Sequence, residues 1–338
     1  MKNKKIMIFG GSGSLGQTLI KRLHKDNTVL VFSRDEAKHW TIRNDFNSDN
    51  LLFSVGDIRD MNRVKEMLLQ FNPNIVIMAS ALKQVDTCEL SPYESVQTNI
   101  IGINNIVSAV EENIIRLKSL ESVLMVSTDK ACSPVNVYGM CKSVSERLVT
   151  VRSKYEHTKG VKFIGVRYGN VLDSRGSIIP LFQHQVKTQE CLTVTHPDMT
   201  RFLMTLDDSV DLILTTLEKS KSGETWIPKL KSMKIVDLAE IYSEMYNKKI
   251  VFTGIRPGEK IHESLVSECE STRATDIGSH YVIRPSYSSE LSNDIFEYSS
   301  KQDILSKEEL KSHLTNLSIL DRNINDFTGR TIEEYKRG

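Results

Sequence analysis

The residues best suited to chemistry lie in one stretch, from Ser127 to Lys142. Tyr138 and Lys142 are four positions apart, so on a helix they share a face one turn apart. Because a lysine charge favours phenolate, Lys142 is expected to lower the pKa of Tyr138 from its usual value of about 10. Asp129 and Lys130 end an apolar run that is typical of a strand, and they add a second proton-handling pair. The stretch therefore predicts a reaction with more than one proton transfer.

A glycine-rich turn near the N-terminus predicts a dinucleotide-binding site. The turn follows the apolar run Ile6–Phe9 and precedes helical periodicity over Leu15–Leu23. The glycine spacing suits a tight turn, a close backbone approach to pyrophosphate and close packing of helix on sheet. The strand–turn–helix context distinguishes this run from an ordinary turn. The candidate cofactor residues here are Gly10, Ser12, Gly13, Ser14, Leu15 and Gly16.

The end of the second apolar run, Thr28–Phe32, favours NADP over NAD. A carboxylate at this point usually binds the ribose 2′-hydroxyl of NAD, whereas a guanidinium suits a 2′-phosphate. Here Ser33 and Arg34 come first; the alternative is that Arg34 is a solvated loop charge and Asp35 binds the ribose. Five further residues are candidates for binding the cofactor or the sugar, but they could equally be ordinary strand ends or solvated side chains. They are Asp57 and Ile58 at the adenine, Ala79 and Ala81 beneath the cofactor, and Lys83 at a phosphate or sugar.

The elements that must position these residues alternate along the first half of the chain. Short apolar runs are separated by segments with helical periodicity, such as Met61–Leu69. This alternation predicts an α/β fold, with a doubly wound parallel sheet covered by helices on both faces. Ser91-Pro92-Tyr93-Glu94 reads as a helix start with Ser91 as the N-cap. The later strands are expected at Ile75–Ala79, Ser122–Ser127 and Lys162–Tyr168.

The length of 338 residues allows two domains. We expect a cofactor-binding domain over 1–170, to which parts of 203–230 return, and a smaller α/β substrate-binding lobe over 171–290. Helices are expected at Asp207–Leu217 and Ile235–Tyr246. Residues 291–338 form a polar C-terminal segment with a short helix near Lys307–Leu314.

The composition excludes several classes of function. The net charge of +1 gives no reason to expect nucleic acid or an anionic membrane as a partner. No apolar run reaches the roughly 18–20 residues of a spanning helix, and no signal-like region precedes the first strand, so a cytoplasmic protein is expected. The five cysteines show no C-x-x-C spacing and the eight histidines no metal-binding spacing, so no metal is expected.

Taken together, these motifs resemble the extended short-chain dehydrogenases/reductases, which have a Rossmann fold. The closer resemblance is to the UDP-N-acetylglucosamine 4,6-dehydratases of polysaccharide biosynthesis, over about residues 4 to 285. The Thr-Asp-Lys run is specific to that branch, and the lack of an N-terminal membrane region is similar to the soluble, C5-inverting group. One departure is Met78–Ala81, where a His-Ala-Ala-Ala run is more common. The segments that carry the resemblance are 32–36, 56–60, 81–85, 127–131, 166–171, 174–177, 199–202 and 256–260.

The resemblance implies roles for individual residues. Thr128, Asp129, Lys130, Tyr138 and Lys142 would be catalytic, with Tyr138 and Lys142 also contacting the cofactor. Tyr138 would take the C4 hydroxyl proton, Lys130 the C5 hydrogen, and Asp129 would protonate the departing C6 hydroxyl. A UDP-sugar is the implied partner, and a homo-oligomer, a dimer or hexamer, is the implied assembly. The implied UDP-sugar contacts are Lys83, Asn170, Arg175, Ser177, Arg201, Arg256 and Glu259.

Two rival functions remain open at this stage. A 4-epimerase, a 4-reductase or a UDP-glucose 4,6-dehydratase would share the Tyr–Lys pair, although the first two have no need of Asp129 and Lys130 as an acid–base pair. A non-catalytic dinucleotide-sensing module would keep the glycine turn but would not need all four proton-handling residues together.

Overall fold

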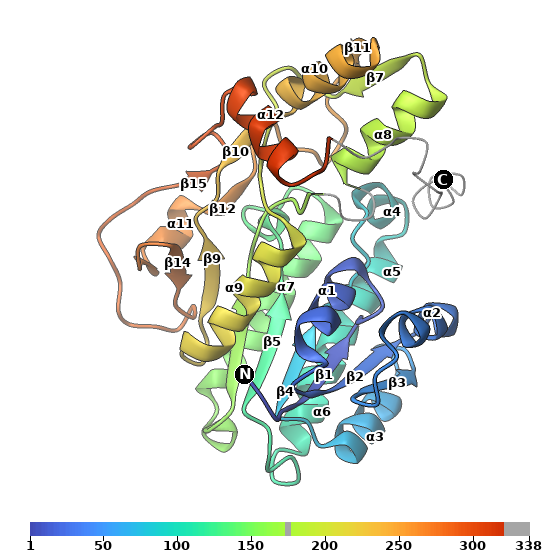
Figure 1. Ribbon diagram of the computed structural model, residues 1–338. Helices are drawn as coiled ribbons and strands as arrows, with labels where there is room; N and C mark the ends of the chain where they lie inside the picture. Colours follow the sequence, from blue (N-terminus) through green and yellow to red (C-terminus); the bar gives the residue numbers. More distant parts are fainter. Residues whose placement is uncertain (173–176, 321–338) are drawn as a thin grey trace. The chain divides into compact units, whose positions relative to one another are not determined.

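The computed structural model describes residues 1–172 and 177–320 and separates into two compact units (Figure 1). Unit 1 contains residues 1–168, 207–229 and 265–297. Unit 2 contains residues 169–206, 230–264 and the chain from 298 onward. The chain therefore passes between the units several times, and each unit has its own core of buried apolar side chains.

Unit 1 is built on a sheet whose described strands run in the order β13-β14-β9-β6-β5-β4-β1-β2-β3. Strands β1 to β6 and β9 are parallel, and β14 and β13 extend the sheet in antiparallel fashion. The order reverses between β1 and β4, which is where open α/β sheets bind their ligands. The bounds are β1 Lys5–Phe9, β2 Thr28–Ser33, β3 Leu51–Val55, β4 Ile75–Met78, β5 Ser122–Val126, β6 Lys162–Val166, β9 Thr225–Pro228, β13 Ala274–Asp276 and β14 His280–Ile283.

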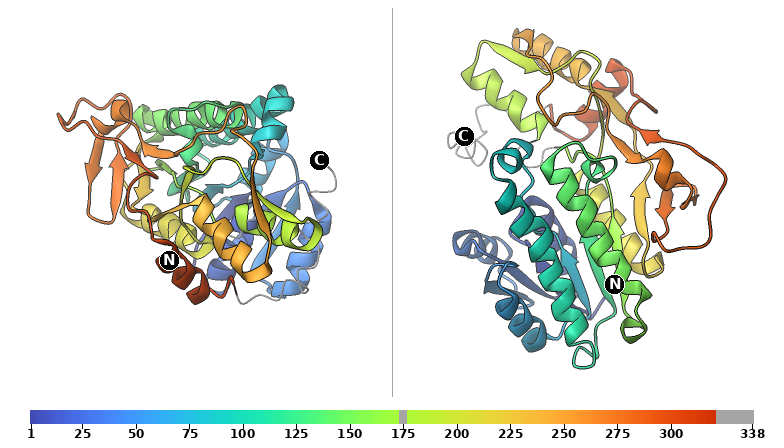
Figure 2. Two further views of the ribbon diagram at one scale, coloured as in Figure 1. Left: turned by 90° about the horizontal axis from the view of Figure 1, so that it is seen from above. Right: turned by 180° about the vertical axis from the view of Figure 1, so that it is seen from behind.

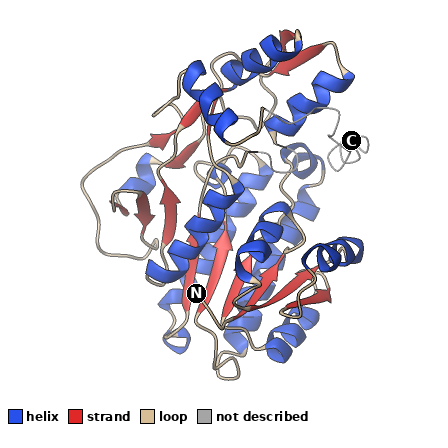
Figure 3. Ribbon diagram, in the orientation of Figure 1, coloured by secondary structure: helices blue, strands red, loops and turns tan. Residues whose placement is uncertain are grey.

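Helices cover both faces of this sheet, as Figures 2 and 3 show, so the predicted doubly wound α/β fold is confirmed. A π-helical turn, Gln97–Ile101, joins α5 to α6, and a 3₁₀ turn, Asp129–Ala131, follows β5. Phe9, Phe32 and Phe163 are among the fully buried side chains of the core. The bounds are α1 Ser14–Leu23, α2 Glu36–Phe46, α3 Met61–Phe71, α4 Val85–Leu90, α5 Pro92–Val96, α6 Gly102–Glu112, α7 Val137–Thr150, α9 Leu206–Lys219 and α11 Glu268–Ser271, with short 3₁₀ turns at Val151–Lys154 and Glu156–Thr158.

In the described part of unit 2, three helices pack around an apolar core that includes Phe182, Leu238 and Leu310. Strand β7 pairs with β11 in parallel, and β8 pairs with β10 in antiparallel fashion. Helix α12 begins with a capping box formed by Ser306 and Glu309. The bounds are α8 Ile178–Thr188, α10 Ile235–Tyr246, α12 Lys307–Asn316, β7 Cys191–Val194, β8 Thr200–Phe202, β10 Ser232–Lys234, β11 Lys249–Phe252, β12 Ser264–Val266 and β15 Tyr298–Ser299.

This division differs from the expected domain boundaries in two segments. Residues 265–290, expected in the substrate-binding lobe, belong to unit 1, because β13 and β14 continue the main sheet next to β9. Residues 298–320, expected in a separate polar segment, belong to unit 2, because Leu310 and Leu314 are buried in its core. No helix in the described ranges has both the length and the apolarity needed to cross a bilayer.

Candidate active site

The glycine turn after β1 is packed too tightly for side chains at two positions. Gly10 has a φ of +83°, and a Cβ added there would lie 2.6 Å from the backbone nitrogen of Ser80, just after β4. A Cβ on Gly16 would lie 2.3 Å from the carbonyl oxygen of Gly11. The turn therefore holds the ends of β1 and β4 and the start of α1 in direct backbone contact.

The start of α1 fits a pyrophosphate. Its N-cap is Gly13, no side chain caps it, and no acidic residue lies in its first turn. The first four N–H groups of a helix lack intrahelical partners and attract anions. An added Cβ on Gly13 would lie 3.5 Å from the carbonyl oxygen of Gly10, an ordinary van der Waals contact, so this position is less crowded than Gly10 and Gly16. The predicted residues Ser12, Ser14 and Leu15 lie on the same turn.

The loops after β2 and β3 bring a second group of predicted cofactor residues together. Arg34 is exposed, and its Nη1 lies 3.8 Å from the Asp57 carboxylate. Burial would raise the pKa of Asp57, but the hydrogen bonds and charge of Arg59 outweigh it and hold that pKa below its usual range. Asp35 instead caps α2, accepting from the backbone N–H of Lys38 at 3.0 Å. Ile58 is buried against Gly102.

His39 is a neighbour of this site that sequence reasoning missed. The Nε2 of this buried histidine lies 2.6 Å from the hydroxyl of Ser33, within hydrogen-bonding distance. Burial lowers the pKa of His39, with Asp35 acting in the opposite direction. Its position on α2, six residues after Ser33, gives no spacing signal in the sequence.

The loop after β4, which contains Ala79, Ala81 and Lys83, is held by a buried asparagine. Asn99, in the π-helical turn, accepts from the backbone N–H of Leu82 at 2.9 Å and donates to its carbonyl at 2.8 Å. Ala81 and Lys83 are exposed. The bidentate contact fixes the loop at the carboxyl end of β4 without using the predicted side chains.

The 3₁₀ turn after β5 concentrates the acid–base groups. The Asp129 side chain is 1% exposed and accepts from the Thr128 hydroxyl at 2.9 Å and from the Lys130 ammonium at 3.2 Å. The Thr128 hydroxyl also bonds to the phenol of Tyr138. The backbone N–H of Asp129 donates to the carbonyl of Tyr168 at 2.9 Å, so the turn is anchored to the end of β6. The structure thus brings Thr128, Asp129, Lys130 and Tyr138 together.

Tyr138 and Lys142 lie on the buried face of α7, as their spacing predicts. The ammonium of Lys142 donates to the carbonyl of Val126 at 2.6 Å. The expectation about the tyrosine differs from the structure: the pKa of Tyr138 is raised, because burial, the charge of Asp129 and Cys88 all disfavour phenolate. Burial also lowers the pKa of Lys142 to about 8, against the opposing effects of Glu146 and Cys141.

Helix α7 is seated on the 3₁₀ turn through Asn136 and Gly139. The Asn136 side chain caps the helix by accepting from the N–H of Gly139 at 2.8 Å. A Cβ on Gly139 would lie 2.1 Å from the carbonyl oxygen of Lys130. Only glycine permits this approach, which brings the Tyr138 helix onto the Asp129–Lys130 turn. Ser127 was also missed: its hydroxyl is buried and has no partner among the described residues.

The described UDP-sugar candidates other than Lys83 lie in unit 2. Arg201 is largely buried, and it donates to the backbone carbonyls of Thr200, Ile261 and Lys260 at 2.7–3.0 Å. Two of these three bonds support the loop before β12. Arg256 and Glu259 lie in that loop, where the backbone N–H of Glu259 donates to the carbonyl of Arg256. The buried side-chain oxygens of Asn170 and Ser177 have no partner within the described ranges. Arg175 lies outside the described residues.

The strand order, the glycine turn at the switch point and the Tyr–Lys helix beside a Thr-Asp-Lys turn define an extended short-chain dehydrogenase/reductase. The chain belongs to the family described as polysaccharide biosynthesis protein, whose model matches residues 6–285. The resemblance inferred from the sequence is thereby confirmed at the level of the family.

Three relatives illustrate the range within this similarity. The chain is 39% identical to UDP-glucose 4-epimerase of Rickettsia prowazekii over 289 residues, 83% of each protein. It is 38% identical to the inverting UDP-N-acetylglucosamine 4,6-dehydratase of Campylobacter jejuni over 287 residues, 84% of this chain and 83% of that protein. The crystal structure of Pen from Bacillus thuringiensis matches with a TM-score of 0.86 at 33% identity, covering 94% of this chain and 99% of that one.

No group of three or more His, Cys, Asp or Glu side chains in residues 1–172 and 177–320 is arranged to hold a metal ion.

Proposed function

We propose that this chain is a UDP-N-acetylglucosamine 4,6-dehydratase that inverts C5 and forms a UDP-4-keto-6-deoxy sugar for glycan biosynthesis. The observation that carries the proposal is the buried Asp129 carboxylate, which is bonded to both Lys130 and Thr128 beside Tyr138. Oxidation at C4 needs one base, whereas loss of water across C5 and C6 needs a further base and an acid. The Asp129–Lys130 pair supplies both next to the tyrosine.

Each residue has a separate task in this proposal. Tyr138 accepts the proton of the C4 hydroxyl, with the ammonium of Lys142 favouring the phenolate. A proton shift within the pair, from the Lys130 ammonium to the Asp129 carboxylate, gives a neutral lysine and a carboxylic acid. The neutral Lys130 then removes the C5 hydrogen, which the C4 ketone has made acidic, and Asp129 protonates the departing C6 hydroxyl, so that water leaves. Hydride transfer from C4 and back to C6 is the chemistry that a bound nicotinamide cofactor supplies. Protonation of C5 from the opposite face then gives inversion.

The test is incubation with UDP-N-acetylglucosamine in D₂O, followed by proton NMR. The wild type should lose water and exchange the C5 hydrogen. Since general acid–base groups contribute about 10²–10⁴-fold, Lys130→Ala should lower both rates by roughly 10³-fold while it still binds the cofactor. Lys65→Ala, which changes a half-exposed lysine paired with Glu112 on another face of unit 1, is the matched control. Wild-type exchange in Lys130→Ala would refute the role of Lys130.

A second candidate is a 4-epimerase, because a relative that is 39% identical carries that name, beside the 38% of the dehydratase. An epimerase inverts C4 without loss of water and has no need for a base at C5. The same NMR experiment separates the two functions, since an epimerase gives the C4 epimer with its C5 hydrogen retained. Parallel incubations with UDP-glucose identify which sugar is the substrate.

We propose NADP as the cofactor, held by the glycine turn, Ser33 and Arg34. Asp35 is engaged as the cap of α2, whereas the guanidinium of Arg34 is exposed directly after β2. Calorimetric titration should show tighter binding of NADP⁺ than NAD⁺. Arg34→Ala should weaken NADP⁺ binding by about tenfold or more, since charged hydrogen bonds contribute about 1.5–3 kcal/mol. Equal losses for both cofactors would contradict the 2′-phosphate contact.

We propose that the sugar nucleotide is bound by the residues predicted from the sequence, with Arg201 also supporting the loop that holds Arg256 and Glu259. The other proposed contacts are Lys83, Asn170, Arg175 and Ser177. Asn170→Ala should raise KM for the UDP-sugar in steady-state kinetics. The same variant should show little change in cofactor affinity when it is measured by the calorimetric titration. We also propose a homo-oligomer, and light scattering coupled to size exclusion gives its mass directly.

A further inference from the structure

Arg167, at the end of β6, forms the centre of a buried ion cluster that the proposed chemistry does not use. The side chain is 2% exposed. It donates to the Glu146 carboxylate at 3.0 and 2.6 Å, to the Glu270 carboxylate at 2.8 and 2.9 Å, and to the carbonyl of Leu265 at 2.9 Å. A guanidinium has five N–H donors, so every donor of Arg167 is engaged.

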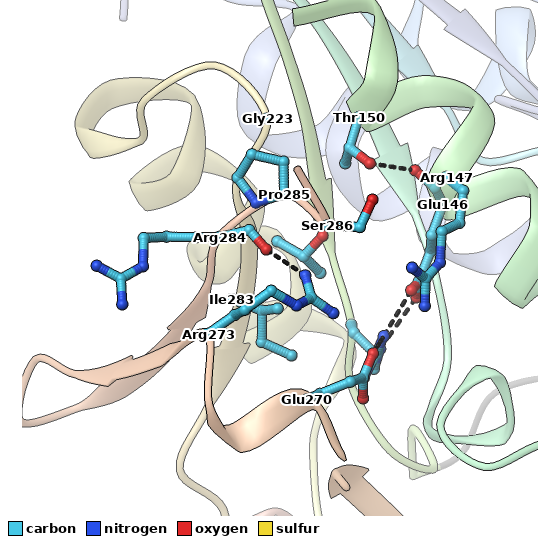
Figure 4. A pocket seen from close by; sticks show the side chains of 12 residues that line it. Glu146, Arg147, Thr150, Gly223, Glu270, Arg273, Ile283, Arg284, Pro285 and Ser286 are labelled. Carbon is cyan, nitrogen blue, oxygen red and sulfur yellow. Dashed lines mark hydrogen bonds and ion pairs between the residues drawn. The ribbon is translucent and has the colours of Figure 1, made fainter. Parts of the chain in front are cut away.

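The cluster joins elements that are far apart in the sequence. Glu146 belongs to α7, and Glu270 belongs to α11 in the segment that returns to unit 1 after residue 264. Figure 4 shows Glu146 and Glu270 entering the cluster from their separate elements, and each carboxylate pairs with Arg167. The carboxylates of Glu146 and Glu270 are nearly buried, and Arg167 donates two hydrogen bonds to each. These bonds hold the carboxylates in fixed positions, unlike the loose pairing of exposed ions at a surface.

One guanidinium cannot neutralise two carboxylates, so further cations must balance the cluster. Arg273 acts on Glu270, whose pKa its charge helps to lower. Arg273 also interacts electrostatically with Glu146. Lys142 lies one helical turn before Glu146, where side chains are about 5–6 Å apart at Cβ. Lys142 is also buried, at 3% exposed, and the charge of Glu146 acts on it.

Burial limits the screening of these charges. Arg167 is 2% exposed and Glu146 is 8% exposed, and a small pocket beside them is bordered by Glu270 and Arg273. Charges that are buried in this way act on one another more strongly than they would at the surface.

We propose that Glu146, held in place by Arg167, is a positioning residue that keeps the buried Lys142 side chain protonated at neutral pH. The functional consequence rests on the proposed function, in which the ammonium of Lys142 favours the phenolate of Tyr138. Without the carboxylate, burial would take the lysine toward its neutral form and the tyrosine would lose that support.

Other titratable groups lie on the elements packed against α7, but their charges are not among those that act on Lys142. The 3₁₀ turn contributes Asp129 and Lys130, α4 contributes Cys88, and α6 contributes Glu111, which pairs with Arg152. Asp129 and Cys88 act on Tyr138. The charges that act on Lys142 are those of Glu146 and, in the same direction, Cys141.

The test measures the protonation of Lys142 directly. Protein labelled with ¹³C at the lysine ε-carbon is titrated by NMR, and the Lys142 signal is identified by its loss in Lys142→Met. The wild-type transition is expected near the pKa of about 8. Glu146→Gln, which is nearly isosteric, should lower that pKa by about one unit. Glu146→Asp, which keeps the charge, should leave it within a few tenths of a unit of the wild type.

Glu270→Gln is the matched control, because it removes the same charge from the same arginine at a position off the α7 helix. It should leave the pKa of Lys142 unchanged. A fall of equal size in Glu146→Gln and Glu270→Gln, or no fall in either, overturns the proposal. The turnover readout is separate: the alkaline limb of the kcat profile should move to lower pH in Glu146→Gln. If no UDP-sugar is turned over, the proposed function fails while the NMR titration still decides the role of Glu146.

Discussion

At the residue scale, the hydroxyl of Thr128 connects the two acid–base sets, because it bonds to both Asp129 and Tyr138. Thr128→Val keeps the shape of the side chain and removes both contacts. A net loss of about 1–1.5 kcal/mol for such a hydrogen bond corresponds to a decrease in kcat of roughly tenfold. Thr128→Ser keeps the hydroxyl and should retain most of the activity. Steady-state kinetics of both variants test this prediction. Equal kcat values for Thr128→Val and Thr128→Ser would show that the hydroxyl does not contribute to catalysis.

Glu270 makes a second prediction at this scale. Burial would raise its pKa, but Arg167 lowers it to about 2, well under the usual value. A carboxyl group with a depressed folded-state pKa stabilises the fold above its unfolded pKa of about 4.5, and that contribution is lost as the pH falls toward 2. The free energy of unfolding of the wild type, measured in urea, should therefore fall steeply as the pH is lowered through this window. Glu270→Gln should be less stable at pH 7 and should show a shallower decline; parallel declines would contradict the assignment.

At the scale of elements, the site depends on α7 touching the 3₁₀ turn. Gly139→Ala would place a methyl group 2.1 Å from the carbonyl oxygen of Lys130 if nothing moved. Because that neighbour is backbone, the helix and the turn must separate, and the acid–base groups would shift by enough to cost about 10²-fold in kcat. Ser143→Ala, on the same helix, is the control. Full activity of Gly139→Ala would show that the turn can yield without loss of catalysis.

The positions of many helices and strands could be predicted from the sequence, whereas the contacts between segments that are distant in the sequence could not. Periodicity located β1, β2 and α10 to within a residue or so, and spacing put Tyr138 and Lys142 on one buried face. The edge strand β3 was missed because it is short and half exposed. The raised pKa of Tyr138 and the capture of Arg201 by backbone carbonyls depend on burial and on contacts between distant segments, which spacing does not encode.

At the scale of the whole molecule, the returning segment 265–297 should unfold with unit 1. Strands β13 and β14 continue the main sheet, and Glu270 and the carbonyl of Leu265 complete the coordination of Arg167. Local opening follows cooperative units of structure rather than sequence order. In hydrogen exchange followed by mass spectrometry, peptides from β14 should therefore share the opening behaviour of β6 and β9.

Peptides from β8 and α10 provide the comparison, because they belong to unit 2. Arg167→Lys should speed exchange in β14 and α11 together, since an ammonium offers three donors where five are used. It should leave exchange in α10 unchanged. If β14 instead exchanged with α10 in the wild type and did not respond to Arg167→Lys, the returning segment would not be a cooperative part of unit 1.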